Sequence, residues 1–292
     1  MVTQQKTVAL REGIAPPRDS SFLRFLYGSR RRRLLLKLLI TRGLSKACGA
    51  FLDSRISKPL IRSFVRKNGI DLSQFESDNF RCFNDCFCRK IKNGLRPIDG
   101  DPTVLVSPCD GLLSAYRIQE DTVLPVKQCP YTLGQLLDSE ELAERFHGGT
   151  CLVFRLCVTH YHRYCYPADG EKSENVFLEG KLHTVRPVAL EKAQVFAENC
   201  REYTLLSTQA FGKILQMEVG AMLVGKIANY HGEKTVVKGE EKGKFLYGGS
   251  TVILLLEKDA VELPDELFAR TVNGLETPVQ MGEALGLSKS SK

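Results

Sequence analysis

The pattern of apolar and polar positions changes about a quarter of the way along the chain. In residues 21–68 apolar residues interleave with Arg and Lys, which predicts two or more basic helices with apolar faces. Residues 71–92 carry four phenylalanines among charged residues, so we expect another helix there, ended by Gly94 and Pro97. Residues 1–20, which are polar and contain a Pro-Pro pair, are expected to fray.

After residue 92 the pattern shortens to strand-like pieces with Gly and Asn at their edges. Residues 104–106 and 151–156 are apolar enough to be strands, and residues 136–146 have the pattern of a helix. Further strands are expected at 203–208, 213–219, 221–229 and 251–257. The sequence therefore predicts an α+β protein.

The predicted organisation is an N-terminal basic amphipathic helical segment followed by a strand-rich body. We place the segment at 1–75 and the body at 76–292. Residues 1–70 hold 16 Lys and Arg against 3 Asp and Glu, so the net charge of +7 belongs to this quarter of the chain. Such an arm favours a polyanionic partner, either an anionic membrane surface or a nucleic acid, although a solvated basic tail is also possible.

The most apolar run near the start favours the membrane surface over a membrane span. Residues 34–40 are six apolar residues around Lys37, whereas a span needs about 20. Neither a longer uncharged run nor a clear cleavage site indicates a signal peptide. No nucleic-acid reader motif and no aromatic platform accompanies the run Arg30–Arg33, so we expect no nucleic-acid partner.

The ten cysteines are not spaced like a disulfide framework. Cys82, Cys86 and Cys88 form a small cluster, but no second Cys or His pair follows at the spacing of a zinc site. We therefore expect reduced, mostly buried thiols and no bound metal.

One candidate for chemistry is the segment Gly248-Gly249-Ser250-Thr251, which precedes a strongly apolar strand. Two glycines permit backbone angles that other residues avoid, so the peptide before Ser250 can take an unusual geometry. The Ser250 hydroxyl could attack the preceding carbonyl if a base removes its proton. The alternative is an ordinary hairpin turn.

A second candidate is Asp110, in the segment Ser107 to Gly111. A carboxylate that follows a strand in a turn with Pro and Gly can orient a base or accept a proton. The alternative is an Asp that only forms the turn.

A third candidate is the pair His160 and His162, which follows the strand at 151–156. If that strand continues, both side chains face the same side, and histidine exchanges protons near neutral pH. The alternative is a structural or surface pair.

Together these segments resemble the phosphatidylserine decarboxylase family, particularly its shorter bacterial branch. The family's Ser-Pro-x-Asp-Gly segment is Ser107 to Gly111 here, and its Tyr-His-Arg segment is Tyr161 to Arg163. Residues 238–251 fit its closing Lys-Gly-x-Glu-x-Gly-x-Phe motif with Gly-Ser-Thr, with one extra Gly. Residues 83–90 and 219–221 also match. The resemblance covers about residues 45–282.

The resemblance implies that the chain is a proenzyme that cuts itself. The Ser250 hydroxyl would attack the Gly249 carbonyl, and elimination would release a beta chain, 1–249, from an alpha chain, 250–292. Ser250 would become a pyruvoyl group, the cofactor. Asp110 matches the acidic member of the family's self-cleavage triad.

The implied reaction is decarboxylation of phosphatidylserine to phosphatidylethanolamine, which makes the protein a carboxy-lyase. The pyruvoyl group forms a Schiff base with the substrate amine and acts as an electron sink. His162 is the expected proton donor or substrate contact. Phe83 and Phe87 either line the entry for the lipid or pack in the core.

This chain departs from the family at the triad. Most members have a second His three residues after the Tyr-His-Arg histidine, and here that residue is Cys165. His160 also stands where many members have Asp. A thiol with an ordinary pKa of about 8.5 is a poorer base than histidine at neutral pH, so His160 or His162 are alternative bases.

The resemblance also implies a homodimer held peripherally at the cytoplasmic face of a bacterial membrane, with phosphatidylserine in an anionic bilayer as substrate. Two other functions stay open. The same pyruvoyl chemistry could act on a soluble amino acid, or the chain could be an unprocessed relative that binds lipid.

Overall fold

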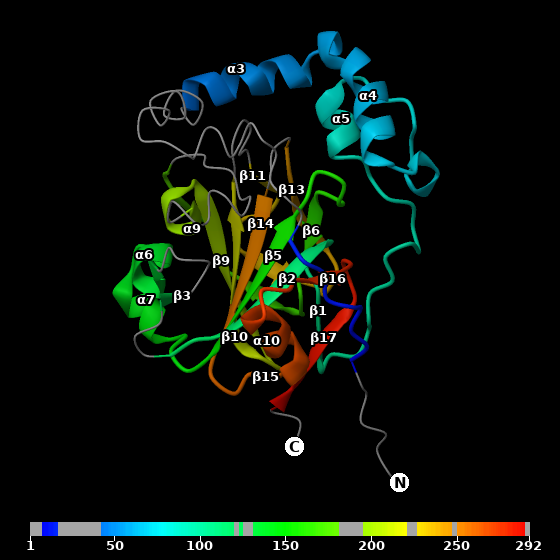
Figure 1. The fold of residues 1–292 in the computed structure, drawn as a ribbon. Helices are drawn as coiled ribbons and strands as arrows, with labels where there is room; N and C mark the ends of the chain where they lie inside the picture. The colour runs from blue at the N-terminus through cyan, green and yellow to red at the C-terminus, as the bar shows by residue number, and fades with distance from the viewer. Residues whose placement is uncertain are drawn as a thin grey trace.

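The computed structural model of the chain describes residues 8–16, 42–119, 123–124, 131–180, 195–220, 227–246 and 250–289. The fold is α+β and strand-rich, with helices at the N-terminal side, so the predicted fold class is confirmed (Figure 1). The predicted boundary between residues 75 and 76 stays a prediction. Within the described parts of the chain, no helix is long and apolar enough to cross a membrane.

Three helices and a 3-10 turn form the N-terminal layer. They are α3 (Arg42–Asp53), η1 (Arg55–Ser57), α4 (Pro59–Asn68) and α5 (Phe83–Phe87), with η2 (Leu72–Gln74) before α5. Proline suits the first turn of α4, and Gly69, with φ 60°, ends that helix in the left-handed conformation. Two of the basic helices predicted in 21–68 are therefore confirmed, and residues 21–41, with the run Arg30–Arg33, lie outside the described residues.

Nine antiparallel strands of the described residues form the main sheet. Their order is β12, β7, β9, β10, β14, β5, β2, β16, and β8 pairs with β9. The strands are β2 (Gly111–Arg117), β5 (Thr150–Leu156), β7 (Gly170–Lys172), β8 (Val176–Leu178), β9 (Arg201–Thr208), β10 (Gly212–Val219), β12 (Lys234–Val236), β14 (Ser250–Leu256) and β16 (Thr277–Val279).

Smaller sheets flank the main one. The first orders β1 (Val104–Val106), β17 (Ala284–Ser288) and β15 (Val261–Glu262), and the second orders β11 (Ile227–Asn229), β13 (Glu241–Phe245) and β6 (Arg163–Cys165). β3 (Val123–Leu124) pairs with β4 (Tyr131–Thr132). The remaining helices are α6 (Leu133–Leu137), α7 (Glu140–Glu144), α9 (Val195–Glu198) and α10 (Asp265–Val272).

The main sheet buries a different cluster on each face. Ile253 and Leu255 of β14 point toward α6, α7 and α9, as do alternate residues of β5 and β10. Val252 and Leu254 point to the opposite face, where Tyr164 and Phe245 cover them. Every residue of β14 is buried, and each fully buried aliphatic side chain contributes about 1.5–3 kcal/mol.

The helical layer lies above the end of the main sheet where β5 ends and β14 begins (Figure 1). Phe64 of α4 packs on Phe83 and Phe87 of α5, with ring centroids 5.0 Å and 6.3 Å apart. Phe83 and Phe87 are buried, so the core alternative is the one that holds for them.

The prediction of one helix over 71–92 is wrong. Within it only η2 and α5 are helical, and Phe75 forms a bridge with Ile91. The backbone of Cys82 is extended, and the buried hydroxyl of Ser57 accepts a hydrogen bond from Phe83 N at 2.9 Å. A tertiary contact therefore fixes where α5 begins, which helical periodicity does not record.

The predicted helix at 136–146 is two short helices. Asp138, with φ 54°, ends α6 in the left-handed conformation, and Ser139 caps α7 by accepting from Leu142 N at 3.2 Å. The expectation that residues 1–20 fray is also wrong for 8–16, because Ile14 forms a bridge with Glu276. The remaining predicted strands are confirmed within one or two residues, except that only 227–229 of the segment 221–229 is described.

Candidate active site

Ser250 opens a central strand of the main sheet. It is the first residue of β14, its Cα partner on β5 is Leu156, and it is 1 % exposed. Its Oγ has no hydrogen-bond partner among the described residues. Burying a hydroxyl without a partner costs free energy, so this atom is a candidate for chemistry. Gly249 lies outside the described residues.

Asp110 is held by an arginine. It lies in the turn between β1 and β2, where Arg96 donates from Nε to Oδ1 at 2.8 Å and from Nη2 to Oδ2 at 2.6 Å. Met281 N donates to Oδ1 at 2.9 Å. Such a bidentate pair is charge-assisted and fixes the plane of the carboxylate. The hydrogen bonds to Asp110 raise the pKa of the Arg96 guanidinium.

The two histidines lie in a turn and not along a strand. β5 ends at Leu156, and His160 N donates to Cys157 O at 2.9 Å, so the prediction that both side chains share one strand face is wrong. Cys157 N donates to His160 Nδ1 at 3.0 Å, which assigns the proton of neutral His160 to Nε2. Burial lowers the pKa of His160.

His162 is completely buried and has a defined tautomer. Its Nδ1 lies 2.9 Å from His160 O, and because a carbonyl only accepts, Nδ1 carries the proton. Nε2 therefore has a free lone pair, with no partner among the described residues. Burial lowers the pKa of His162 to about 3, and the ring of Phe87 lies against it at an angle of 37°, with the ring centroids 4.0 Å apart.

Cys165, in β6, is also completely buried. Burial raises the pKa of its thiol to about 12, so the thiol stays protonated at neutral pH. The Sγ lies 3.9 Å from Ser107 O. This buried environment disfavours the thiolate form of Cys165, which is the form that the residue would need in order to act as a base.

The structure brings Asp110, His160 and Cys165 into one cluster. Cys165 N donates to Pro108 O at 2.8 Å, and the charge of Asp110 acts to raise the pKa of both His160 and Cys165. Within the described residues no hydrogen bond joins Asp110 to either histidine. His162 and Ser250 flank the same end of the sheet, because the turn at 157–162 follows Leu156, the partner of Ser250.

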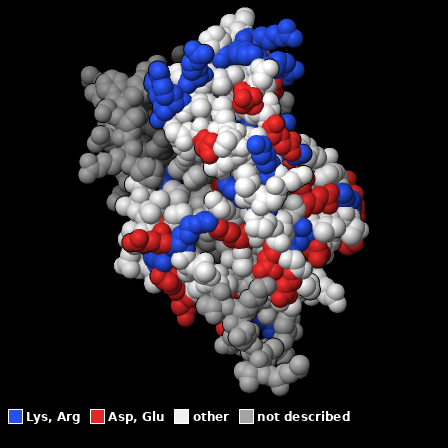
Figure 2. Space-filling model, turned by 90° about the vertical axis from the view of Figure 1, so that its right-hand side faces the viewer, with Lys and Arg blue, Asp and Glu red and all other residues white. Residues whose placement is uncertain are grey.

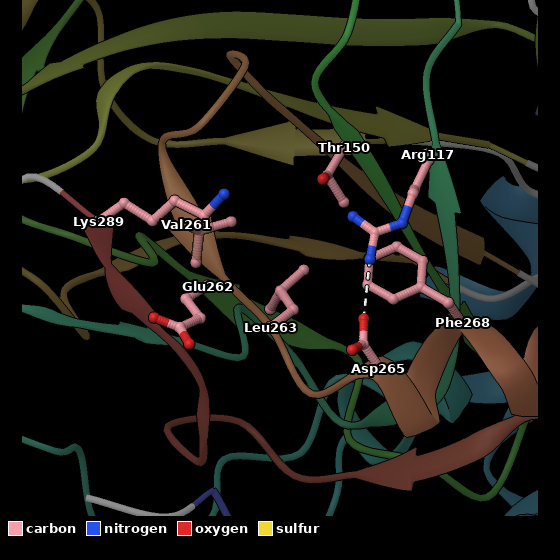
Figure 3. A pocket seen from close by; sticks show the side chains of 8 residues that line it. All are labelled: Arg117, Thr150, Val261, Glu262, Leu263, Asp265, Phe268 and Lys289. Atoms are coloured by element: carbon pink, nitrogen blue, oxygen red, sulfur yellow. Dashed lines mark hydrogen bonds and ion pairs between the residues drawn. The ribbon is translucent and has the colours of Figure 1, made fainter. Parts of the chain in front are cut away.

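Figure 3 shows a pocket at the other end of these strands. Its volume is about 450 Å³, and it includes Thr150, the Cα partner of Leu256 at the far end of β14 from Ser250. Its Arg117 is paired with Asp265 at 2.8 Å and lies over the ring of Phe268. This pocket holds none of the predicted site residues.

The cysteine cluster lies in the core. Among the described residues no group of three His, Cys, Asp or Glu side chains is placed to hold a metal ion. Cys82, Cys86 and Cys88 are free and buried. Burial raises the pKa of Cys86 to about 11 and that of Cys88 to about 12.

Comparisons with known proteins agree on one family. The model of the phosphatidylserine decarboxylase family matches residues 83–287, which include Asp110, His162 and Ser250. The chain belongs to the phosphatidylserine decarboxylase family.

Individual relatives support the same assignment. The chain is 42 % identical over 265 residues to phosphatidylserine decarboxylase proenzyme 2 of Clostridium acetobutylicum, covering 90 % of this chain and 91 % of that protein. It is 41 % identical over 271 residues to a phosphatidylserine decarboxylase proenzyme of Clostridium perfringens, covering 91 % and 92 %. The predicted family, its decarboxylase function and its carboxy-lyase class are therefore confirmed.

The candidate site contains polar residues that the sequence analysis missed. Gln216 and Glu218 on β10 lie on the same sheet face as Ser250, because they pair with Leu254 and Val252. The side-chain oxygen Oε1 of each residue has no hydrogen-bond partner within the described residues. Two polar residues at alternate positions among the apolar residues of 214–219 were a signal that could have found them.

Glu218 is part of a buried ion pair. Its Oε2 accepts from Lys242 Nζ at 2.5 Å and from Asn229 Nδ2 at 3.1 Å, and both charged side chains are 0 % exposed. Burial raises the pKa of Glu218, and Lys242 opposes that rise. Tyr164 OH donates to Asn229 Oδ1 at 3.1 Å, so the pair is held in a network behind the Ser250 end of β14.

Arg89 is a second buried cation that sequence reasoning missed. It is 3 % exposed and donates from Nη2 to Thr159 O at 3.1 Å, in the turn that carries both histidines. Its Nε has no partner, and no carboxylate pairs with it in the described part of the chain. After burial, its charge is the largest cause that lowers the pKa of His162.

Proposed function

We propose that this chain is a phosphatidylserine decarboxylase proenzyme that cuts itself between Gly249 and Ser250. The observation that carries the proposal is the pair of buried, unpartnered atoms at one end of the sheet, Ser250 Oγ and His162 Nε2. One is a hydroxyl that needs to lose a proton, and the other is a lone pair that can take it.

His162 is the proposed base for Ser250. Its tautomer leaves Nε2 free, and burial and the charge of Arg89 keep the ring neutral at all ordinary pH values. Cys165 is a weaker candidate, because its thiol is protonated below a pKa of about 12. Neutral His160 has no free lone pair, because its Nδ1 accepts from Cys157 N and its Nε2 carries the proton.

Self-cleavage would proceed by attack of Ser250 Oγ on the Gly249 carbonyl carbon, with the proton passing to His162 Nε2. The peptide C–N bond breaks as the ester C–O bond forms, and the freed Ser250 amine takes the proton back from His162. The ester then loses the residue 1–249 chain as a carboxylic acid by elimination across Ser250. The dehydroalanine that remains takes up water and releases ammonia to become the pyruvoyl group. Asp110, clamped by Arg96, acts through its charge and not through a hydrogen bond to histidine.

The surroundings of Ser250 fit a pyruvoyl group. The residue is buried among apolar side chains, and the unpartnered oxygens of Gln216 and Glu218 lie on its sheet face. The pyruvoyl group supplies a carbonyl that takes the substrate amine and draws electrons from the α-carbon as CO2 leaves. The proton that replaces CO2 at that carbon comes from water, and His162 can only relay it, because Nε2 is unprotonated in the neutral ring.

The substrate in this proposal is phosphatidylserine in an anionic membrane, and the product is phosphatidylethanolamine. The basic helices α3 and α4 lie over the Ser250 end of the sheet, which would place that end against a bilayer (Figure 1). We propose a peripheral location at the cytoplasmic side of a cell membrane. The family resemblance suggests a homodimer of paired beta and alpha chains.

The test is the intact mass of the purified, denatured protein. We expect two chains, 1–249 and 250–292, with a pyruvoyl end on the smaller one. Ser250→Ala should give one uncut chain, and His162→Gln should slow cutting by at least about a hundredfold, within the range of general-base effects. Cys165→Ala is the matched control and should still be cut.

The same measurement decides between the proposal and an unprocessed lipid-binding relative. The engagement of Asp110 by Arg96 and the protonated thiol of Cys165 favour that second candidate. A single unbroken chain in the wild-type protein would establish it. Turnover of lipid vesicles compared with free amino acids then separates a lipid decarboxylase from a soluble amino acid decarboxylase.

A further inference from the structure

A basic pocket lies at the corner between η1 and α4. Its volume is about 340 Å³, and it is lined by Arg55, Lys58, Asn79, Phe80 and Arg81. It shares no residue with the Ser250 site. We call it the corner pocket.

The cations of the corner pocket are poorly neutralised. Lys58 Nζ donates to the neutral Asn79 Oδ1 at 3.2 Å, and Arg81 meets Asp85 only at 3.4 Å with 64 % of its side chain exposed. Arg55 has no ion pair with any described residue. Three cations around one concavity, with no carboxylate lining it, are suited to an anion with several acceptor oxygens, such as a phosphate.

Buried contacts hold the walls of the corner pocket together. Ser57, which lies between Arg55 and Lys58 in the sequence, is fully buried. Its hydroxyl accepts a hydrogen bond from Phe83 N at 2.9 Å and donates one to Leu52 O at 3.0 Å. Phe80, on the other wall, is 7 % exposed. The pocket is therefore part of the packed layer of α3, α4 and α5.

Exposed apolar side chains surround the pocket. Ile56, next to Arg55, is 76 % exposed, and Phe51 and Leu60 are 45 % and 44 % exposed. Residues 42–68 hold seven Lys and Arg and one Asp. Figure 2 shows Lys and Arg side chains gathered at one end of the molecule. Apolar side chains flanked by cations are the pattern of a surface that lies on an anionic bilayer.

We propose that the corner pocket binds the headgroup phosphate of an anionic phospholipid at a bilayer surface, with Ile56 inserted among the acyl chains. The lipid bound there is distinct from the reacting phosphatidylserine molecule. The proposal rests on the membrane part of the proposed function and is independent of self-cleavage.

The corner pocket is connected to the Ser250 site through aromatic packing. Phe64, on α4, contacts Phe87, whose ring lies 4.0 Å from that of His162. A lipid held at the corner would therefore fix the layer that covers His162, and place the Ser250 end of the sheet over the membrane.

The test compares two triple variants that remove the same charge from the same layer. Arg55→Gln/Lys58→Gln/Arg81→Gln removes the pocket cations, and Arg62→Gln/Arg66→Gln/Lys67→Gln removes three exposed cations of α4 outside the pocket. Binding of full-length protein to phosphatidylcholine vesicles with and without phosphatidylglycerol is measured by flotation. Thermal unfolding of both variants checks that they fold.

We expect the control triple to lose binding by about fivefold per residue, as general attraction to an anionic surface requires. The pocket triple should lose about tenfold more, and only on vesicles with phosphatidylglycerol. Equal losses of vesicle binding in the two triple variants would mean that general electrostatic attraction accounts for the binding, and would overturn the proposal that the corner pocket binds a phosphate.

A second pair of variants tests the bilayer as the source of the phosphate. Ile56→Ser should weaken vesicle binding by about tenfold, whereas Val272→Ser, which changes an 86 % exposed residue on α10, should not. If Ile56→Ser has no effect and inorganic phosphate binds the pocket as tightly as the vesicles do, the ligand is a soluble anion and the proposal is wrong.

The intact mass of each variant separates this proposal from the proposed function. Both triples should be cut before Ser250 as the wild type is. If the wild type is not cut but the vesicle results hold, self-cleavage fails while the corner pocket stands.

Discussion

The two faces of the central strands β10 and β14 bury different kinds of side chain. Toward α6, α7 and α9 the strands present apolar residues, with one threonine at the end: Leu215, Met217, Val219, Thr251, Ile253 and Leu255. Toward β6 and β13 the same strands present Gln216, Glu218 and Ser250 among apolar neighbours. Residues 214–219 of β10 and all residues of β14 are buried, whichever face they point to.

The difference shows where the fold accepts a cost in stability. A buried ion pair is often no more stabilising than apolar residues of the same volume, and a buried hydroxyl without a partner is destabilising. The apolar face is close to the composition that stability alone favours, although Thr251 Oγ1 at its end is also buried without a partner among the described residues. The polar face keeps Glu218, Lys242 and Ser250 at the end of the sheet where His162 lies, as a site of chemistry requires.

The largest expected effect comes from removing one member of the buried pair. Glu218→Leu leaves Lys242 as an unpaired buried cation, and we expect it to lower the free energy of unfolding by about 3–5 kcal/mol. The double variant Glu218→Leu/Lys242→Met should recover most of that loss in chemical denaturation. If the double variant is stable and still fully processed, the buried pair of Glu218 and Lys242 has no role in the chemistry.

A cavity on the apolar face should affect stability alone. Ile253→Ala removes a fully buried side chain, which we expect to cost about 3 kcal/mol in chemical denaturation. The protein that remains folded should be cut before Ser250 at the wild-type rate. Loss of cutting in folded Ile253→Ala would show that the two faces are not separable.

The pH dependence of stability should report His162. Its pKa is about 3 when folded and about 6.5 when unfolded, so between these values the unfolded chain binds the extra proton. Stability should therefore fall as pH drops from about 6.5 toward 3, by up to about 1.4 kcal/mol per pH unit from this group. His162→Gln should flatten that slope, and an unchanged slope would place the titration elsewhere.

The smallest expected effect is that of Cys165→Ala. The thiol is buried and protonated, so removing it should cost about 1 kcal/mol of stability and change the rate of self-cleavage by less than about twofold. Time courses of cutting after a pH or temperature shift measure this rate. A large decrease in the rate of self-cleavage would indicate that Cys165 is the base.

Local sequence patterns predicted the strands better than the helices. The strands at 104–106 and 151–156 are apolar runs bounded by turn residues, and they lie within one residue of the predicted positions. The segment 71–92 was wrong because its aromatic residues pack against α3 and α4 and the turn with His162, so their spacing follows tertiary contacts.

The motifs correctly predicted that the candidate side chains lie near one another, but they did not predict the hydrogen-bond and ion-pair partners of those side chains. Asp110 was expected to serve a histidine, and the structure pairs it with Arg96, which has no local pattern that marks it. Arg89 was passed over for the same reason. The tautomer of His162 depends on the carbonyl of His160 in a turn, whereas the sequence analysis considered only a continuation of the strand at 151–156.

The position of Ser250 at the start of β14 decides what a cut there would do to the molecule. β14 is paired on both sides, with β10 and β5 of the larger piece, and β17 is paired with β1. The two pieces would stay together through these strands. Once separated by denaturation, however, they would have to meet again as two molecules, so recovery would depend on protein concentration. The mature protein would then be preserved by slow unfolding more than by refolding.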